Sequence, residues 1–164
     1  MGRNRKVNSV LKNFIAHSRE LRESPAWRAL PDNTRRVLDR LELEHLRHAG
    51  SENGNLPCTY SDFVEAGLRR ASVSLAIRQC EALGFLQITR RGGRSISDVR
   101  RPSLYRLTYV VGRGKSDVPT DEWKRIASAA DSAAALKRAA CERNVDTQHA
   151  QTSKKLDAKT ELLA

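Results

Sequence analysis

Arginine is concentrated in one part of this 164-residue chain. Residues 69–115 hold eleven basic and two acidic residues, a net charge of +9, in a chain whose total is +11. Ten of these eleven bases are arginines, and the planar guanidinium group forms paired hydrogen bonds with phosphates and with guanine edges. The stretch therefore favours recognition of nucleic acid. A solvated basic surface without a partner is the alternative, although ordinary surfaces intersperse the two signs of charge.

The pattern around these arginines predicts a helix followed by a hairpin. Residues 69–83 have the spacing of a helix that ends at Gly84. Its apolar face is formed by Val73, Ala76, Ile77, Cys80 and Leu83. The opposite, polar face is then left to solvent. Alternation over 85–89 and 104–110 predicts two strands, joined by a long basic connector rich in Gly, Arg, Ser and Pro.

The preceding residues predict the scaffold that carries this pair of elements. Ser24-Pro25 favours the start of a short helix over 26–30, and Pro31-Asp32 starts a long helix over 32–49. A short strand over 56–58 and a short helix over 60–66 follow, the latter with a capping pair at Thr59 and Asp62. One face of the long helix is expected to be packed: Thr34, Val37, Leu38, Leu41, His45, His48 and Ala49.

Residues outside this core are expected to serve other purposes. A further helix is predicted from about 120 to 140, with an inward stripe of Trp123, Ile126, Ala127, Ala130, Ala134 and Cys141. A second apolar face on the long helix, at Leu43 and Leu46, together with this alanine-rich helix, favours a homodimer. The polar, charge-balanced residues 142–164 predict a disordered tail.

The order helix, short strand, short helix, tight turn, helix and hairpin resembles that of bacterial winged helix-turn-helix proteins. The stretches that carry the resemblance are TYSDFVEAG at 59–67 and AIRQCEALGF at 76–85. Within the second, Glu-Ala-Leu-Gly-Phe is similar to the junction between recognition helix and wing in MarR-like regulators. Three further stretches resemble an uncharacterised proteobacterial family associated with mobile elements: SPAWRALP at 24–31, RRVLDRL at 35–41 and YRLT at 105–108.

This resemblance implies an α+β fold, with a three-helix core and a β-hairpin wing over 24–114. A basic arm (1–23) would precede it, and a C-terminal helix (115–141) would follow. DNA-binding residues are expected on the recognition helix, namely Arg69, Arg70, Ser72, Ser74, Arg78 and Gln79. Others are expected on the wing, namely Arg90, Arg91, Arg94, Arg100 and Arg101. Ser74 and Arg78 are predicted to reach base edges.

The function expected from these features is that of a sequence-specific transcriptional regulator that binds double-stranded DNA and has no catalytic activity. Two alternatives stay open. The chain could be a replication-initiation or excision-control factor of a plasmid, phage or integrative element, or a module whose wing binds protein or RNA. A cytoplasmic, nucleoid-associated location is expected, because no apolar run has the length of a membrane helix or of a signal peptide.

No cofactor or metal is expected. The sequence contains neither a Walker-type GxxxxGK[ST] loop nor a GxGxxG motif. His45 and His48 are three residues apart on a helix, but no third metal ligand lies nearby in the sequence. The odd number and wide spacing of Cys58, Cys80 and Cys141 fit neither a disulfide framework nor a zinc site, and the three thiols are expected to be small core residues.

Overall fold

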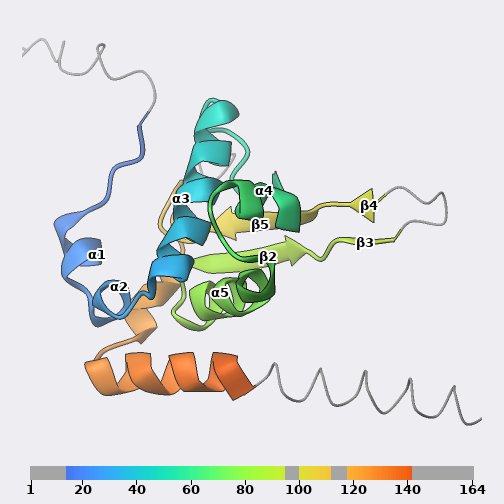
Figure 1. Ribbon diagram of the computed structural model, residues 1–164. Coiled ribbons are helices and arrows are strands. Elements are labelled where there is room, and N and C mark those ends of the chain that lie inside the picture. The colour runs from blue at the N-terminus through green and yellow to red at the C-terminus, as the bar shows by residue number, and fades with distance from the viewer. Residues whose placement is uncertain (1–13, 95–99, 112–117, 142–164) are drawn as a thin grey trace, which may run out of the picture.

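Six α-helices and a small antiparallel sheet form the described part of the chain, in an α+β arrangement (Figure 1). The computed structural model describes residues 14–94, 100–111 and 118–141. The elements before the hairpin are α1 (Arg19–Glu23), α2 (Pro25–Arg28), α3 (Asp32–Arg47), β1 (Leu56–Cys58), α4 (Tyr60–Glu65) and α5 (Arg70–Ala82). The later ones are β2 (Leu86–Arg90), β3 (Gly93–Arg94), β4 (Arg100–Arg101), β5 (Ser103–Leu107) and the 3₁₀ turn η1 (Glu122–Arg125). A final helical segment covers residues 129–141.

The three-stranded sheet has the order β1-β5-β2, and both pairings are antiparallel. A bulge between Ile88 and Arg90 interrupts the pairing of β2 with β5, and such bulges increase the local twist of a strand. Beyond it, β3 pairs with β4 and lengthens the hairpin. Figure 1 shows this hairpin projecting from the body, past the ends of α4 and α5. We call the hairpin segment from β2 to β5 the wing.

A tight turn joins α4 to α5. Gly67 has a φ of +91°, which side-chain-bearing residues rarely adopt. The amide of Leu68 donates to the carbonyl of Phe63, and both of these side chains are buried. The predicted cap at the start of α4 is confirmed, because Thr59 Oγ1 accepts from the Asp62 amide while the Asp62 carboxylate accepts from the Thr59 amide. These local features fix the direction in which α5 leaves α4.

Aromatic side chains fill the core on both sides of α3. Trp27 meets Phe85 and Tyr109 edge to face, with ring centroids 5.6 and 6.4 Å away. Phe63 meets Tyr105 at 6.0 Å, so α4 is attached to the central strand. The predicted packing of Val73, Ala76, Ile77, Cys80 and Leu83 is confirmed, since all five are buried. The opposite side of α5 is turned away from α3 and is partly covered by the helix over 129–141.

The first segment described, residues 14–30, belongs to the folded body. The sequence places a basic arm over 1–23, but Leu21 of α1 is buried in the core, and His17 lies 2.8 Å from a carboxylate oxygen of Glu42 on α3. The Ser18 side chain caps α1 by accepting from the Leu21 amide. Trp27 is buried, as the sequence predicts. The basic residues of 1–13 lie outside the described residues.

The packed face of α3 is shorter than predicted. His48 and Ala49 are exposed, because the helix ends at Arg47 and Ala49 adopts a φ of +51°. The carboxylate of Glu44 is held there by Arg40 at 2.6 Å. Burial raises the pKa of Glu44, but the hydrogen bond and charge of Arg40, together with His48 and Arg47, outweigh burial and hold that pKa below its ordinary value.

The predicted single helix over 120–140 is wrong. The structure has η1, a non-helical step at Ile126-Ala127, and then a second helix over 129–141. Ser128 and Asp131 cap this helix, with the Ser128 amide donating to the Asp131 carboxylate at 2.9 Å. The helix therefore restarts out of phase. Ser132, Ala135 and Ala139 are the buried residues, whereas Ala127, Ala130, Ala134 and Cys141 are exposed. The expected tail at 142–164 lies outside the described residues.

Within the described ranges, none of the helices combines the length and the apolar character needed to cross a bilayer.

Candidate nucleic-acid interface

Two neighbouring clefts separate α5 from the wing. The first has a volume of about 470 Å³ and is lined by Tyr60, Ser74, Ile77, Arg78, Glu81, Ile88, Arg91, Gly92, Ser103 and Tyr105. The second, of about 340 Å³, is lined by Cys58, Thr59, Tyr60, Ser61, Arg70, Gly92, Arg101, Pro102 and Ser103. Both share Tyr60, Gly92 and Ser103, so they are adjacent. Four arginines from α5 and the wing therefore line one continuous surface, which we call the α5–wing surface.

Tight backbone packing holds the two sides of the wing together near its base. The amide of Gly92 donates to Ser103 Oγ at 2.9 Å. A Cβ atom at Gly92 would lie 2.6 Å from the carbonyl oxygen of Arg101, a distance that real side chains do not tolerate. On the other side, Thr89 Oγ1 donates to the Gly54 carbonyl at 2.7 Å. These contacts fix where Arg91 and Arg101 leave the strands.

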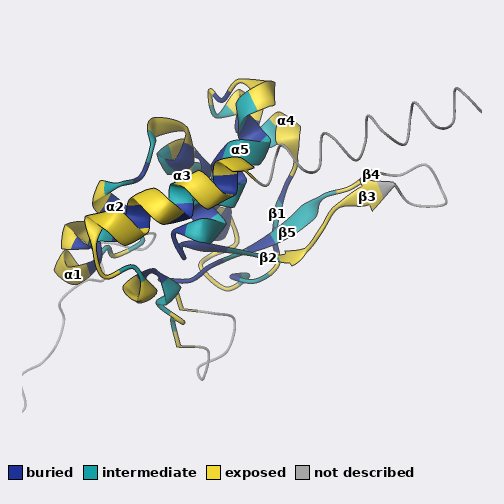
Figure 2. Ribbon diagram, turned by 90° about the horizontal axis from the view of Figure 1, so that it is seen from below, coloured by how far each residue is buried: buried dark blue, intermediate teal, exposed yellow. Residues whose placement is uncertain are grey.

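Most of the predicted binding residues are accessible. Arg69 and Arg70 are exposed at the start of α5, and Arg90, Arg91 and Arg101 are exposed on the wing. Ser72 and Ser74 are half-buried on the same helix. Figure 2 shows the outer part of the wing in the colour of exposed residues. Arg94 and Arg100 belong to β3 and β4, but their side chains lie outside the part of the chain that the structure describes.

Gln79 is not on the open face of α5, contrary to the prediction. Its side-chain carbonyl accepts from Thr34 Oγ1 at 2.9 Å, and Thr34 is wholly buried in α3. The residue lies at the border between the packed and the open sides, and the buried hydroxyl of Thr34 needs an acceptor. Gln79 therefore joins two helices through its side-chain carbonyl.

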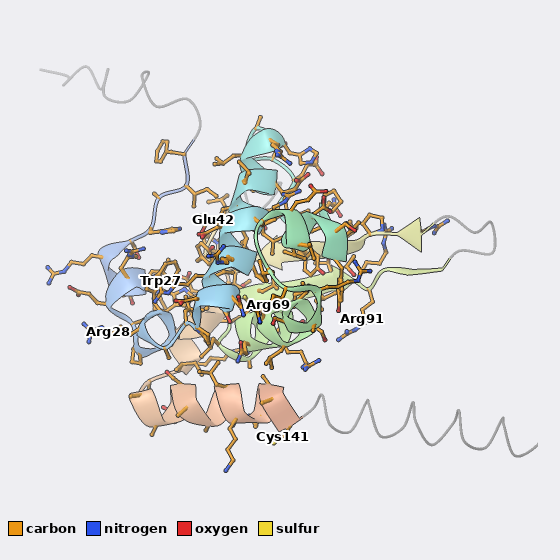
Figure 3. All side chains as sticks on the ribbon, viewed as in Figure 1. Trp27, Arg28, Glu42, Arg69, Arg91 and Cys141 are labelled. Atoms are coloured by element: carbon orange, nitrogen blue, oxygen red, sulfur yellow. The ribbon has the colours of Figure 1, made fainter. Side chains whose placement is uncertain are left out.

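Arg78 is also engaged, which the sequence did not indicate. Its Nε donates to the carbonyl oxygen of Ala139 at 3.0 Å, and its Nη1 donates to Ser74 Oγ at 2.8 Å. Ala139 belongs to the helix over 129–141, which lies beside α5 (Figure 3). In this arrangement two of the five N–H donors of Arg78 are used within the chain and its Nη2 is buried, so the guanidinium is not turned freely toward a base.

Tyr60 is a surface residue that the sequence analysis did not single out. It is the first residue of α4, is 40% exposed and lines both clefts. A phenol group between arginines offers a hydroxyl donor for a phosphate oxygen. The sequence places Tyr60 directly after the capping residue Thr59 and three residues before the core residue Phe63, which predicts a side chain on the surface of α4. That this side chain lies next to the wing depends on the folding of the hairpin and could not be predicted from the sequence.

One acidic side chain, Glu81, lines the first cleft, where its carboxylate accepts from the Ile88 amide at 3.3 Å and so connects α5 with β2. Tyr105 closes the floor of that cleft, and burial raises its pKa to about 12. It is therefore neutral at physiological pH. The exposed charges contributed by Arg70, Arg91 and Arg101 make the α5–wing surface predominantly basic.

The described residues contain no group of three or more His, Cys, Asp and Glu side chains arranged to hold a metal. His45 is buried, and this burial lowers its pKa. Cys58 and Cys80 are buried as predicted, and burial raises the pKa of Cys58 to about 12. Cys141 is exposed, contrary to the prediction, because the last helix is rotated relative to the predicted stripe.

Comparison with known proteins adds no family: no protein-family model, curated protein or solved structure matches this chain. The function must therefore be inferred from the residues of the α5–wing surface.

Proposed function

We propose that this chain is a winged helix-turn-helix protein that binds double-stranded DNA sequence-specifically and regulates transcription. In this interpretation α3, α4 and α5 are the three-helix core, α5 is the recognition helix, and the wing is the hairpin from β2 to β5. The observation that carries the proposal is the convergence of the start of α5, Tyr60 and the wing arginines on adjacent clefts.

The first half of α5 supplies groups suited to the major groove. Arg70 is exposed and lines the second cleft, and Ser74 lines the first. Arginine reads guanine and serine can contact several bases. Exposed Arg69, just before the helix, is placed to contact a flanking phosphate, and the methyl of exposed Ala71 suits a thymine methyl.

The wing supplies phosphate contacts beside that helix. Arg90 and Arg101 are exposed on strands whose positions are fixed by backbone hydrogen bonding, and exposed Arg91 lies between β2 and β3. Guanidinium groups on a narrow hairpin suit the phosphate backbone or a narrow minor groove. Such contacts strengthen binding to all sequences alike, whereas the contacts from α5 discriminate among them.

The proposal includes a homodimer, and the support for it is an exposed surface of α3. Leu43 is 47% exposed and lines a groove with Asp32, Arg35, Arg36, Asp39, Arg40 and Ala66. Both signs of charge border this exposed leucine, so the surface is suited to pairing with its own copy across a two-fold axis. The alanine-rich helix contributes less than expected, because Ala135 and Ala139 pack within the chain.

DNA affinity is expected to fall steeply with salt. Neutralising about five phosphates per subunit gives a slope of log K against log salt of about −4 to −5. Raising the salt from about 50 to about 200 mM should then weaken binding ~10²–10³-fold. Fluorescence anisotropy with a labelled duplex measures this slope. Binding that is independent of salt would contradict a phosphate-contacting surface.

Selection from a pool of random duplexes tests sequence specificity directly. Enrichment of one motif would support the proposal, and enrichment of a palindrome would match a two-fold dimer that acts at a promoter. Iterated direct repeats would instead favour a replication or excision factor. Recovery without any enriched sequence would contradict specific recognition by α5.

A further inference from the structure

The helix over 129–141 lies along the outer side of α5, on the side away from α3. In Figure 1 it is the last coloured helix and lies below α5. In Figure 3 the label of Cys141 marks the C-terminal end of this last helix, again below α5. The hydrogen bond from Arg78 Nε to the Ala139 carbonyl confirms that the two helices are in contact. A helix at this position borders the cleft between α5 and the wing, because Arg78 also lines that cleft.

The guanidinium of Arg78 is confined by this contact. Its Nε is bound to Ala139 and its Nη1 to Ser74, while Nη2 is buried without a hydrogen-bond partner. A charged donor that is removed from water and left unpaired destabilises the state that contains it. The docked helix therefore holds the half-buried Arg78 in one orientation, with its Nη2 out of contact with water and unpaired, at a cost in stability.

The contacts that hold the helix in place are small. Its buried residues are Ser132, Ala135 and Ala139, with Leu136 only partly buried. Alanine side chains bury little apolar area, and the hydrophobic contribution scales with that area. The non-helical step at Ile126-Ala127 separates the helix from η1. The helix can therefore leave α5 without disturbing Trp123, which is buried in the core.

We infer that the helix over 129–141 is an autoinhibitory element, which in its docked position withholds Arg78 from DNA. Release of the helix frees the guanidinium to contact the duplex beside Ser74. The inference rests on the proposed DNA-binding function and adds to it a closed and an open state. The two equilibria are linked: if release of the helix raises the affinity for DNA by some factor, binding of DNA raises the equilibrium constant for release by the same factor.

A substitution under the helix tests this inference. Ala135→Gln places a long polar side chain in the contact with the body, and Ala134→Gln places the same side chain on the exposed face of the same helix. Neither changes the charge. Ala135→Gln is expected to bind a selected duplex about tenfold more tightly, within the usual range of coupling between sites, and Ala134→Gln should bind like the wild type.

The gain should depend on Arg78. Adding Arg78→Ala to Ala135→Gln is expected to abolish the tighter binding, since the released helix then uncovers no guanidinium. Unchanged or weaker binding by Ala135→Gln would overturn the inference while leaving the DNA-binding function intact. If neither the wild type nor Ala135→Gln binds any duplex at low salt, both the inference and the proposed function are overturned.

Hydrogen exchange on the unmodified chain provides a test without any variant. Adding duplex is expected to speed amide exchange within 129–141, while exchange in α5 slows. Slower or unchanged exchange within 129–141 in the complex would show that the helix stays docked on DNA, and would overturn the inference.

Discussion

Replacing Arg91 and Arg101 together by glutamate is expected to weaken duplex binding by about 100-fold or more at moderate salt. Both side chains are exposed, and each lines one of the two clefts between α5 and the wing. The double variant removes two phosphate contacts and places two negative charges against the DNA backbone. Anisotropy titration with a labelled duplex measures the loss.

A control variant with the same change in net charge shows whether the loss of DNA binding depends on where the arginines lie. Arg28→Glu with Arg125→Glu changes the net charge by the same amount, and both arginines are exposed. Arg28 lies at the opposite end of the molecule from Arg91 (Figure 3). This control should lose only the small long-range contribution of the net charge. Equal losses in the two double variants would contradict a localised interface.

Gly84→Ala is expected to lower the free energy of unfolding by about 2–4 kcal/mol. Gly84 has a φ of +80°, and a Cβ atom there would lie 2.6 Å from backbone atoms of both Glu122 and Trp123. The substitution therefore adds backbone strain and separates η1 from the start of the sheet. Urea denaturation followed by circular dichroism measures the change.

Gly54→Ala measures how much of this loss of stability comes from the positive φ alone, without any steric clash. Gly54 also has a positive φ, +105°, but no heavy atom would lie within 4 Å of its Cβ. About 1 kcal/mol of destabilisation is expected there. If the two alanine variants were equally stable, close packing of η1 against Gly84 would not contribute to the fold.

Features encoded by neighbouring residues could be predicted from the sequence. The packed face of α5 follows from apolar spacing over a single helix, and the cap at Thr59 and Asp62 follows from two residues three apart. The short strand at 56–58 and the basic hairpin were also predicted, because alternation and turn residues are local signals.

Features that depend on distant partners could not be predicted. Arg78 is held by Ala139, 61 residues away, and Gln79 is held by Thr34, 45 residues away. Helical spacing places both side chains on or near the open face and says nothing about what covers it. The rotation of the last helix depends on the capping pair Ser128 and Asp131, which the spacing of apolar residues places inside a single longer helix.

Mapping the contact surface by NMR tests the interface most directly. A ¹⁵N-labelled sample is titrated with a short duplex at low salt, and shifts of backbone amide signals are recorded. The α5–wing interface predicts the largest shifts at Tyr60, Arg70, Arg91 and Arg101, with little change at Arg28. Shifts concentrated on α1 and α2 instead, with the wing and the start of α5 unaffected, would contradict it.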